Sequence, residues 1–336
     1  VVRIGGAARL EAQLAGAPPE TSDLAPGADH EVALAAVLGF VTAHAGRWRI
    51  IAVVHRVVHG GANYVAPVVV TPAILADLAA LSPLAPLHQP HNLAAIAASA
   101  RLAGGVPDIA CFDTAFHAGR GALFDSFAVS QEMRQRGVRR YGFHGLSYQW
   151  VAHALREKHP DLHAGRVVAA HLGNGASLCA IKGGVSIDTT MGLTALDGLP
   201  MGTRTGSIDP GAILFMLRHL GMSLDEVEAE LYHRSGLKGL SGISNDVETL
   251  LKSDDLRAAF ALDYFALRTA QHVAAMATSM GGVDALVFTG GIGEHAAPVR
   301  DAIVSRLRFL GELPILVVPA EEERLMAMQA LQLLNA

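Results

Sequence analysis

Two glycine-rich segments of the sequence have the composition of phosphate-binding turns. Residues 289–294 (TGGIGE) follow an apolar run and precede a helical pattern, and residues 171–177 (HLGNGAS) alternate glycines with short polar side chains. Because glycine has no Cβ, such turns let backbone N–H groups approach a phosphate closely. A ligand-free reading is open for both: residues 289–294 could be a tight strand-to-helix turn, and the Asn-Gly of residues 171–177 is a common hairpin sequence.

Two arginines stand beside glycines, where ligand contacts are common. Arg204 lies within residues 201–210 (MGTRTGSIDP), and Arg56 lies within residues 55–61 (HRVVHGG) after an apolar run. A guanidinium presents a fork of donors that matches a phosphate or a carboxylate. A flexible surface loop would also explain the glycines around Arg204. If these arginines bind a ligand, it is an anionic small molecule.

Histidines and an aspartate are further candidates for chemistry: His88, Asp113, His117 and His144. The chain has 16 histidines, so most of them must have structural hydrogen-bonding roles. Pairs such as His55 and His59 lack the helical context or the glutamate of a zinc site. A structural metal is therefore not expected.

The elements expected around these residues are those of an α/β protein. Helices are expected over residues 210–220 and 262–279. A helix over residues 147–158 has an apolar face, with Ser147 placed to cap its start. Residues 167–189 are expected to form a β-meander, with turns at Gly-Asn-Gly and Lys-Gly-Gly. Strands are predicted from apolar runs at residues 50–54, 167–170, 285–289 and 315–318.

Composition limits the class of protein. With 336 residues the chain is expected to form two domains, and 51% hydrophobic with 17% charged residues excludes a disordered chain. A net charge of −5 without a block of Lys or Arg indicates neither a nucleic-acid nor a membrane-surface partner. Apolar runs fall short of the ~20 residues of a membrane span. Cys111 and Cys179 lack a Cys-x-x-Cys spacing, so a cytoplasmic protein is expected.

Two nucleotide-binding folds can be compared with these motifs. The chain has no Gly-x4-Gly-Lys-Ser/Thr segment, which excludes a P-loop. Gly291-x-Gly293-x-x-Ala296 matches a relaxed dinucleotide fingerprint, but only about 40 residues follow it. That is too little for a doubly wound domain, so an NAD-dependent dehydrogenase is the weaker alternative.

Taken in order along the chain, these segments resemble the acetate kinase family. The resemblance implies the actin, hexokinase and Hsp70 type of fold, in which a ribonuclease H-like α/β domain is duplicated around a cleft for ATP. It implies an N-terminal domain of residues 1–113 with 324–336, a C-terminal nucleotide-binding domain of residues 114–323, and a homodimer. The matching stretches are 55–61, 84–89 (LAPLHQ), 112–117 (FDTAFH), 140–145 (RYGFHG), 171–177, 201–210, 241–246 (SGISND) and 289–294.

The resemblance also implies roles for individual residues. Arg204 and His144 would stabilise the transferred phosphoryl group, and Asp113 would act as the proton-transfer or substrate-positioning group. Glu322 resembles the Mg²⁺-associated glutamate, with Glu321 and Glu323 one position away. The implied substrate-binding residues are Arg56, Val58, Leu87, His88 and Phe143. The implied nucleotide contacts are His171, Gly173, Asn174, Gly175, Asp246, Gly291, Ile292, Gly293 and Glu294.

The implied reaction is the reversible, Mg²⁺-dependent transfer of a phosphoryl group from ATP to acetate, giving acetyl phosphate and ADP. Ala195 stands where family members often have Pro, so propionate is an alternative acceptor, although one methylene is worth only ~1–3 kcal/mol. Glu248 and His295 replace a usual Arg and Asn, and the connection over residues 311–319 is short.

The resemblance does not extend to the family's opening segment. That segment is a strand followed by an Asn-x-Gly-Ser-Ser-Ser-x-Lys turn, which supplies a phosphate loop. This sequence contains neither. We expect that residues preceding Val1 supply it. The alternative is a catalytically impaired, nucleotide-binding relative.

Overall fold

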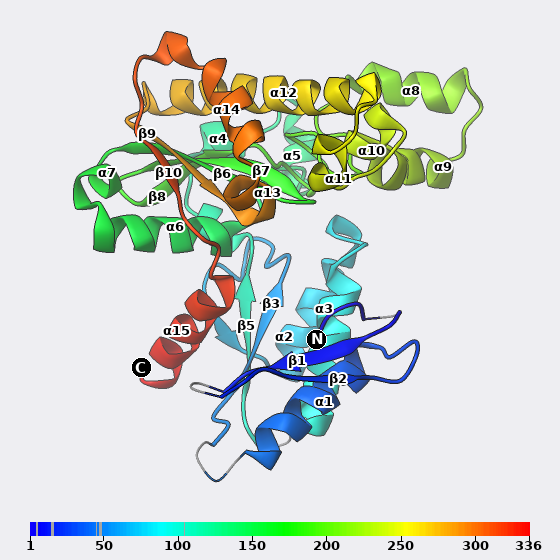
Figure 1. The fold of residues 1–336 in the computed structure, drawn as a ribbon, viewed down its shortest axis with the longest axis vertical. Helices are drawn as coiled ribbons and strands as arrows, with labels where there is room; N and C mark the ends of the chain where they lie inside the picture. The colour runs from blue at the N-terminus through cyan, green and yellow to red at the C-terminus, as the bar shows by residue number, and fades with distance from the viewer. Residues whose placement is uncertain (5, 15–16, 45, 47–48, 104) are drawn as a thin grey trace. The chain divides into compact units, whose positions relative to one another are not determined.

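The computed structural model describes residues 1–4, 6–14, 17–44, 46, 49–103 and 105–336 (Figure 1). The chain forms two compact units, one of Val1–Phe112 with Met326–Ala336 and one of Asp113–Leu325. Both units contain helices and β-sheets, so the predicted α/β, two-domain class is confirmed. The domain boundaries expected from the resemblance stay a prediction.

The second unit is built on a five-stranded sheet with the strand order β10-β9-β6-β7-β8. β6 pairs antiparallel with β7 and β7 with β8, which confirms the predicted meander, whereas β9 and β10 run parallel to β6. This mixture is not the parallel sheet of a doubly wound dinucleotide-binding domain. The strands are β6 (Arg166–Leu172), β7 (Ala176–Lys182), β8 (Val185–Thr189), β9 (Ala285–Thr289) and β10 (Ile315–Val317).

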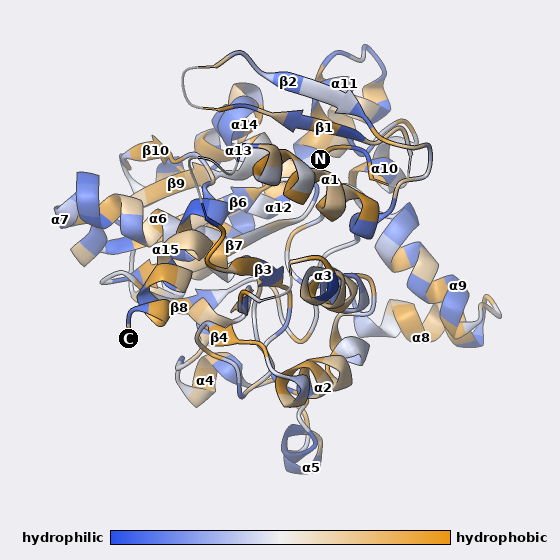
Figure 2. Cartoon of the chain, turned by 90° about the horizontal axis from the view of Figure 1, so that it is seen from below, coloured by the Kyte–Doolittle hydropathy of each residue, from blue (hydrophilic) through white to orange (hydrophobic). Residues whose placement is uncertain are grey.

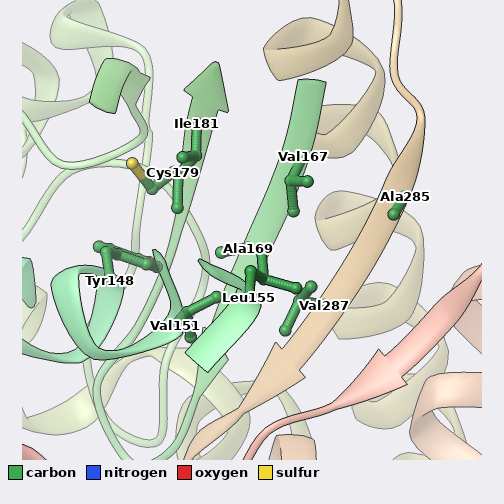
Figure 3. Packing of buried hydrophobic residues seen from close by; sticks show 9 residues of the cluster. All are labelled: Tyr148, Val151, Leu155, Val167, Ala169, Cys179, Ile181, Ala285 and Val287. Carbon is green, nitrogen blue, oxygen red and sulfur yellow. The ribbon is translucent and has the colours of Figure 1, made fainter. Parts of the chain in front are cut away.

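The core of this unit lies between the sheet and helix α6 (Gly145–Lys158) (Figure 3). Val167 and Ala169 are two positions apart on β6, so both point to the face that α6 covers. Tyr148, on α6, belongs to the same buried cluster as these strand residues. Helix α12 (Leu256–Met280) also packs against this sheet, and Figure 1 shows it on the other face. The central strands are consequently buried on both sides.

The first unit contains a three-stranded sheet with the order β3-β5-β4 and a separate β1-β2 hairpin. β3 runs parallel to β5, and its ladder begins where the Val53 N–H donates to the Pro107 carbonyl. The strand predicted over residues 50–54 therefore begins later, and Arg56 lies inside β3 rather than after it. The elements are β1 (Arg9–Ala12), β2 (Glu20–Asp23), α1 (His30–Ala43), β3 (Val53–Val57), β4 (Val68–Val69), α2 (Pro72–Ala80), η1 (Ser82–Leu84), α3 (Gln89–Leu102) and β5 (Asp108–Phe112).

The remaining elements are mostly helices of the second unit. Within the described part of the chain, no helix is both long and apolar enough to cross a membrane. The remaining elements are η2 (Ala115–His117), α4 (Ala122–Asp125), α5 (Gln131–Gln135), α7 (Pro160–Ala164), α8 (Pro210–Arg218), α9 (Leu224–Ala229), the π-helix η3 (Glu230–Arg234), α10 (Gly236–Ser241), α11 (Val247–Leu251), α13 (Gly290–His295), α14 (Ala297–Ser305), η4 (Arg308–Leu310) and α15 (Glu322–Leu334).

Candidate active site

His144 stands at the start of α6 in a strained backbone conformation. Its φ of 57° and ψ of 23° lie in the left-handed region, which costs a non-glycine residue of order 1–3 kcal/mol. The next residue, Gly145, donates its N–H to the Asp113 carbonyl at 2.8 Å, and a Cβ there would lie 2.3 Å from that oxygen. The close approach requires glycine and fixes the turn that presents His144.

The His144 ring is held by a serine and by a second histidine. Its Nδ1 lies 2.8 Å from the Ser177 Oγ, and the ring stacks on that of His171 with centroids 4.3 Å apart. The Nδ1 of His171 lies 2.8 Å from the Ser147 Oγ. The prediction that Ser147 caps the helix is therefore wrong. The helix begins earlier, at Gly145, and the hydroxyl of Ser147 orients His171.

Gly175 brings His144 and Arg204 to one point. A Cβ on Gly175 would lie 3.3 Å from the His144 Nε2 and 3.7 Å from the Arg204 Nη2. The turn itself is closed by a bond from the Gly173 N–H to the Gly175 carbonyl at 3.0 Å. The structure thus places an imidazole and a guanidinium beside the same glycine of the predicted phosphate loop.

The Arg204 guanidinium is largely buried. One of its nitrogens, Nη1, donates to the Ala195 carbonyl at 2.9 Å, and burial lowers the pKa of the guanidinium from its ordinary value. Among the residues that the structure describes, no carboxylate forms an ion pair with it. An arginine stays protonated even so, and a buried cation of this kind is stabilised by an anionic ligand.

Asn174 connects the predicted phosphate loop to two other motifs. Its carbonyl accepts a bond from the Gly202 N–H at 3.0 Å, and its Oδ1 accepts one from the Asn245 Nδ2 at 3.0 Å. The neighbouring Asp246 caps α11 by accepting from the Thr249 N–H at 2.8 Å. Hydrogen bonds from Thr249 lower the pKa of Asp246. Segments 171–177, 201–204 and 241–246 therefore meet in the second unit.

The predicted glycine-rich turn at residues 289–294 is the first turn of α13, which begins directly after β9. Gly290 has a φ of 77°, and a Cβ there would lie 3.3 Å from the His171 Nε2. The Oε1 of Glu294 accepts the N–H groups of Gly290 at 3.1 Å and Ala320 at 3.0 Å. Glu294 thus caps backbone donors, while Gly291 is exposed with open space around its Cβ position. Ile292 is half-buried and Gly293 is buried in the same helical turn.

The first unit carries four of the predicted substrate residues. Arg56 is exposed on β3, and Val58 follows that strand with its N–H bonded to the Asn92 Oδ1 at 3.0 Å. Half-buried Leu87 precedes His88, the residue before the first residue of α3. These side chains lie around the C-terminal end of β3 and the start of α3.

Asp113 and Phe143 belong to the second unit, and both are almost completely buried. The Asp113 carbonyl accepts the N–H of Gly145, which follows His144, and the Phe143 carbonyl accepts from the His117 Nε2 at 2.9 Å. Residue types alone did not single out several residues that build the site. Ser177 and Asn245 lie within the motifs at residues 171–177 and 241–246, and Ser147 was expected only as a helix cap, whereas nothing in the sequence marked Tyr148.

Glu322 is the candidate magnesium ligand, at the start of α15 and half-buried. No group of three or more His, Cys, Asp or Glu side chains arranged to hold a metal occurs within the described ranges. Magnesium is commonly bound by one or two carboxylates together with substrate phosphates. The carboxylate of Glu322 is a ligand of the type that this ion takes.

Comparison with known proteins identifies clear relatives. The model of the acetokinase family matches residues 8–324. The chain is 50% identical over 289 residues to an acetate kinase of Rhodopseudomonas palustris, covering 86% of this chain and 73% of that one. It is 45% identical over 303 residues to an acetate kinase of Nitrobacter hamburgensis, covering 84% and 75%.

Solved structures agree in fold. A propionate kinase from Francisella tularensis has a TM-score of 0.90 and 32% identity, covering 97% of this chain and 90% of that one. An acetate kinase from Porphyromonas gingivalis has a TM-score of 0.86 and 32% identity, covering 98% and 91%. The predicted fold and family are both confirmed.

Proposed function

Because the chain belongs to the acetokinase family, we propose that it transfers a phosphoryl group reversibly between ATP and acetate, with acetyl phosphate and ADP as products. The observation that carries this proposal is the convergence of the His144 imidazole and the Arg204 guanidinium on Gly175. The relatives with the higher identities are acetate kinases, whereas the propionate kinase is 32% identical. Acetate is therefore favoured over propionate as the acceptor.

The chemistry requires positioning and neutralisation of charge rather than a covalent enzyme intermediate. In the transition state of phosphoryl transfer, negative charge is spread over the oxygens of the transferred group. Donors preorganised in a dry site stabilise that charge. Arg204 and His144 supply these donors, the backbone turn at residues 173–175 receives nucleotide phosphate, and Asp113 orients the acid.

We assign the acetate side of the reaction to residues of the first unit together with Phe143. Arg56 would pair with the carboxylate or the acyl phosphate, assisted by His88. The apolar side chains of Val58, Leu87 and Phe143 are assigned to binding of the methyl group. The adenosine side is assigned to Asp246 and to residues 291–294. Glu322, together with the phosphates, would hold Mg²⁺, which would supply charge neutralisation.

The direct test is formation of acetyl phosphate from acetate and Mg-ATP, trapped as the hydroxamate. Arg204→Ala is expected to lower kcat by ~10³-fold or more, as for arginines that contact a transferred phosphoryl group. The matched control is Arg136→Ala, which removes an exposed arginine that pairs with Glu132 at 3.8 Å. Full activity of Arg204→Ala would overturn the assigned role.

Calorimetry with ATP distinguishes an active kinase from a catalytically impaired relative that still binds nucleotide. Calorimetry that detects ATP binding by wild-type protein, without any turnover in the hydroxamate assay, would favour that alternative. Turnover with acetate above that with propionate would support the acetate kinase assignment.

We also propose that the enzyme is a cytoplasmic homodimer. Two buried free cysteines, Cys111 and Cys179, suit a reducing compartment. Helix α8 has no buried residue, although its sequence, PGAILFMLR, is almost entirely apolar (Figure 2). Leu214 and Phe215 are 48% and 52% exposed. A contiguous apolar helix of this kind is typical of a protein–protein interface.

A further inference from the structure

We propose that Tyr148 is a positioning residue that acts through Ser177 to fix the tautomer of His144. This inference rests on the proposed function. The Tyr148 hydroxyl lies 2.5 Å from the Ser177 Oγ, and that oxygen lies 2.8 Å from the His144 Nδ1. Three side chains therefore form one chain of hydrogen bonds that ends on the candidate catalytic imidazole.

The surroundings of Tyr148 and Ser177 restrict the direction in which each hydroxyl proton of this hydrogen-bond chain points. Tyr148 and Ser177 are both 0% exposed, so no bulk water competes for their hydroxyls. Burial raises the pKa of Tyr148 well above its ordinary value, so the phenol remains protonated. A phenol is more acidic than an aliphatic alcohol, so of these two hydroxyls Tyr148 is the better donor, and we assign its O–H as the donor to the Ser177 Oγ.

The serine transmits this direction to the imidazole. Ser177 has a single hydroxyl proton. Since its oxygen accepts from Tyr148, that proton is directed to the His144 Nδ1. The Nδ1 of a histidine that accepts a hydrogen bond is unprotonated, and the ring proton is carried by Nε2.

The tautomer of His144 determines whether its Nε2 can donate a hydrogen bond to the transferred phosphoryl group. The His144 Nε2 is the atom that lies 3.3 Å from the Cβ position of Gly175, beside the Arg204 Nη2. With a proton on Nε2, the ring donates to a phosphoryl oxygen placed there. With the proton on Nδ1, the Nε2 lone pair would face that oxygen and repel it. The relay thus keeps the imidazole in its donor form.

The stacked histidine offers an internal comparison. His171 also has its Nδ1 at 2.8 Å from a serine hydroxyl, that of Ser147. Ser147→Ala therefore removes a hydrogen bond of the same length from the neighbouring ring and leaves the Tyr148–Ser177–His144 chain intact.

The test combines steady-state kinetics with ¹⁵N NMR of histidine-labelled protein, in which Nδ1 and Nε2 shifts report the tautomer. The His144 signals would be assigned by their loss in His144→Gln. In Tyr148→Phe we expect kcat to fall about tenfold, the worth of one hydrogen bond, with little change in KM for ATP. We also expect the His144 shifts to move towards a mixture of tautomers.

Four further variants complete the design. Ser177→Ala should reproduce both effects, and it carries the test if Tyr148→Phe does not fold, whereas Ser177→Thr keeps a hydroxyl and should restore the wild-type shifts. Ser147→Ala should leave the His144 shifts unchanged. Tyr264→Phe, a tyrosine of α12 outside the relay, should leave kcat unchanged.

Two results would overturn the relay. One is unchanged His144 shifts in both Tyr148→Phe and Ser177→Ala. The other is a shift in tautomer without any fall in kcat. If the wild-type enzyme forms no acetyl phosphate, the proposed function fails, and the NMR measurement still decides whether the relay sets the tautomer.

Discussion

Gly291 allows the nucleotide assignment to be tested without disturbing the fold. It lies in the first turn of α13, has no positive φ, and would carry a Cβ with no atom within 4 Å. Replacing such a glycine with alanine reduces the entropy of the unfolded chain and stabilises a protein by about 0.4–1 kcal/mol. The free energy of unfolding of Gly291→Ala should therefore rise slightly.

If the adenosine of ATP packs against this backbone, the same methyl group occupies space that the ligand needs. Overpacking of a well-fitted contact costs about 1–3 kcal/mol. That range corresponds to about a 5- to 150-fold rise in KM for ATP. KM for acetate should stay within about twofold, since Gly291 is not assigned to the acid side.

The assay is acetyl phosphate formation over a range of ATP concentrations, beside urea unfolding of the same preparations. Gly39→Ala is the matched control, because Gly39 lies in α1 with open space at its Cβ position. It should gain stability with KM for ATP unchanged. A Gly291→Ala enzyme that is more stable and has the wild-type KM for ATP would refute the assignment of Gly291 to the nucleotide.

Three other predictions follow from the same structure. In Gly202→Ala the new Cβ would lie 1.9 Å from the Asn174 Oδ1, so the Asn174 side chain must move. We expect the free energy of unfolding in urea to fall by about 1–3 kcal/mol and kcat to fall strongly. Wild-type kinetics would contradict the role of Asn174. Burial lowers the pKa of His117 to about 3, so between pH 6.5 and 3 the unfolded chain binds a proton that the folded chain does not. The free energy of unfolding should therefore fall by about 1.4 kcal/mol per pH unit as the pH drops through this window, and this component should be absent in His117→Gln. Replacing both Leu214 and Phe215 by Glu should convert a dimer into monomers in analytical ultracentrifugation, with the free energy of unfolding of the subunit unchanged. A monomeric wild-type protein would contradict the proposed homodimer.

The sheet of the second unit could be predicted because its signals are local. Apolar runs of strand length, separated by Gly-Asn-Gly and Lys-Gly-Gly, determine the order of β6, β7 and β8. β9 lies at residues 285–289, as its apolar run predicts. Residues that are adjacent in the sequence suffice to predict these strands and turns, since each turn depends on two or three consecutive glycines and polar side chains.

The geometry of the candidate site depends on partners that are distant in the sequence. The left-handed conformation of His144 is imposed by the bond between Gly145 and the Asp113 carbonyl, which no local pattern reveals. For the same reason Ser147 resembled a helix cap, because a serine before an apolar face usually is one. Its true partner, His171, comes from β6, and only the packing of α6 on the sheet brings the two together.

The discontinuous composition of the first unit has a consequence for biosynthesis. Residues 1–112 are translated before residues 113–325, yet residues 326–336 complete that unit only after the whole of residues 113–325 has been made. Domains generally fold as units during synthesis, beginning with the N-terminal one. Here we expect the second unit to be the first complete unit, while the first unit is completed only when residues 326–336 have been made. A ribosome that stalls before residue 326 would release a folded second unit attached to an unfinished partner, a natural substrate for chaperones.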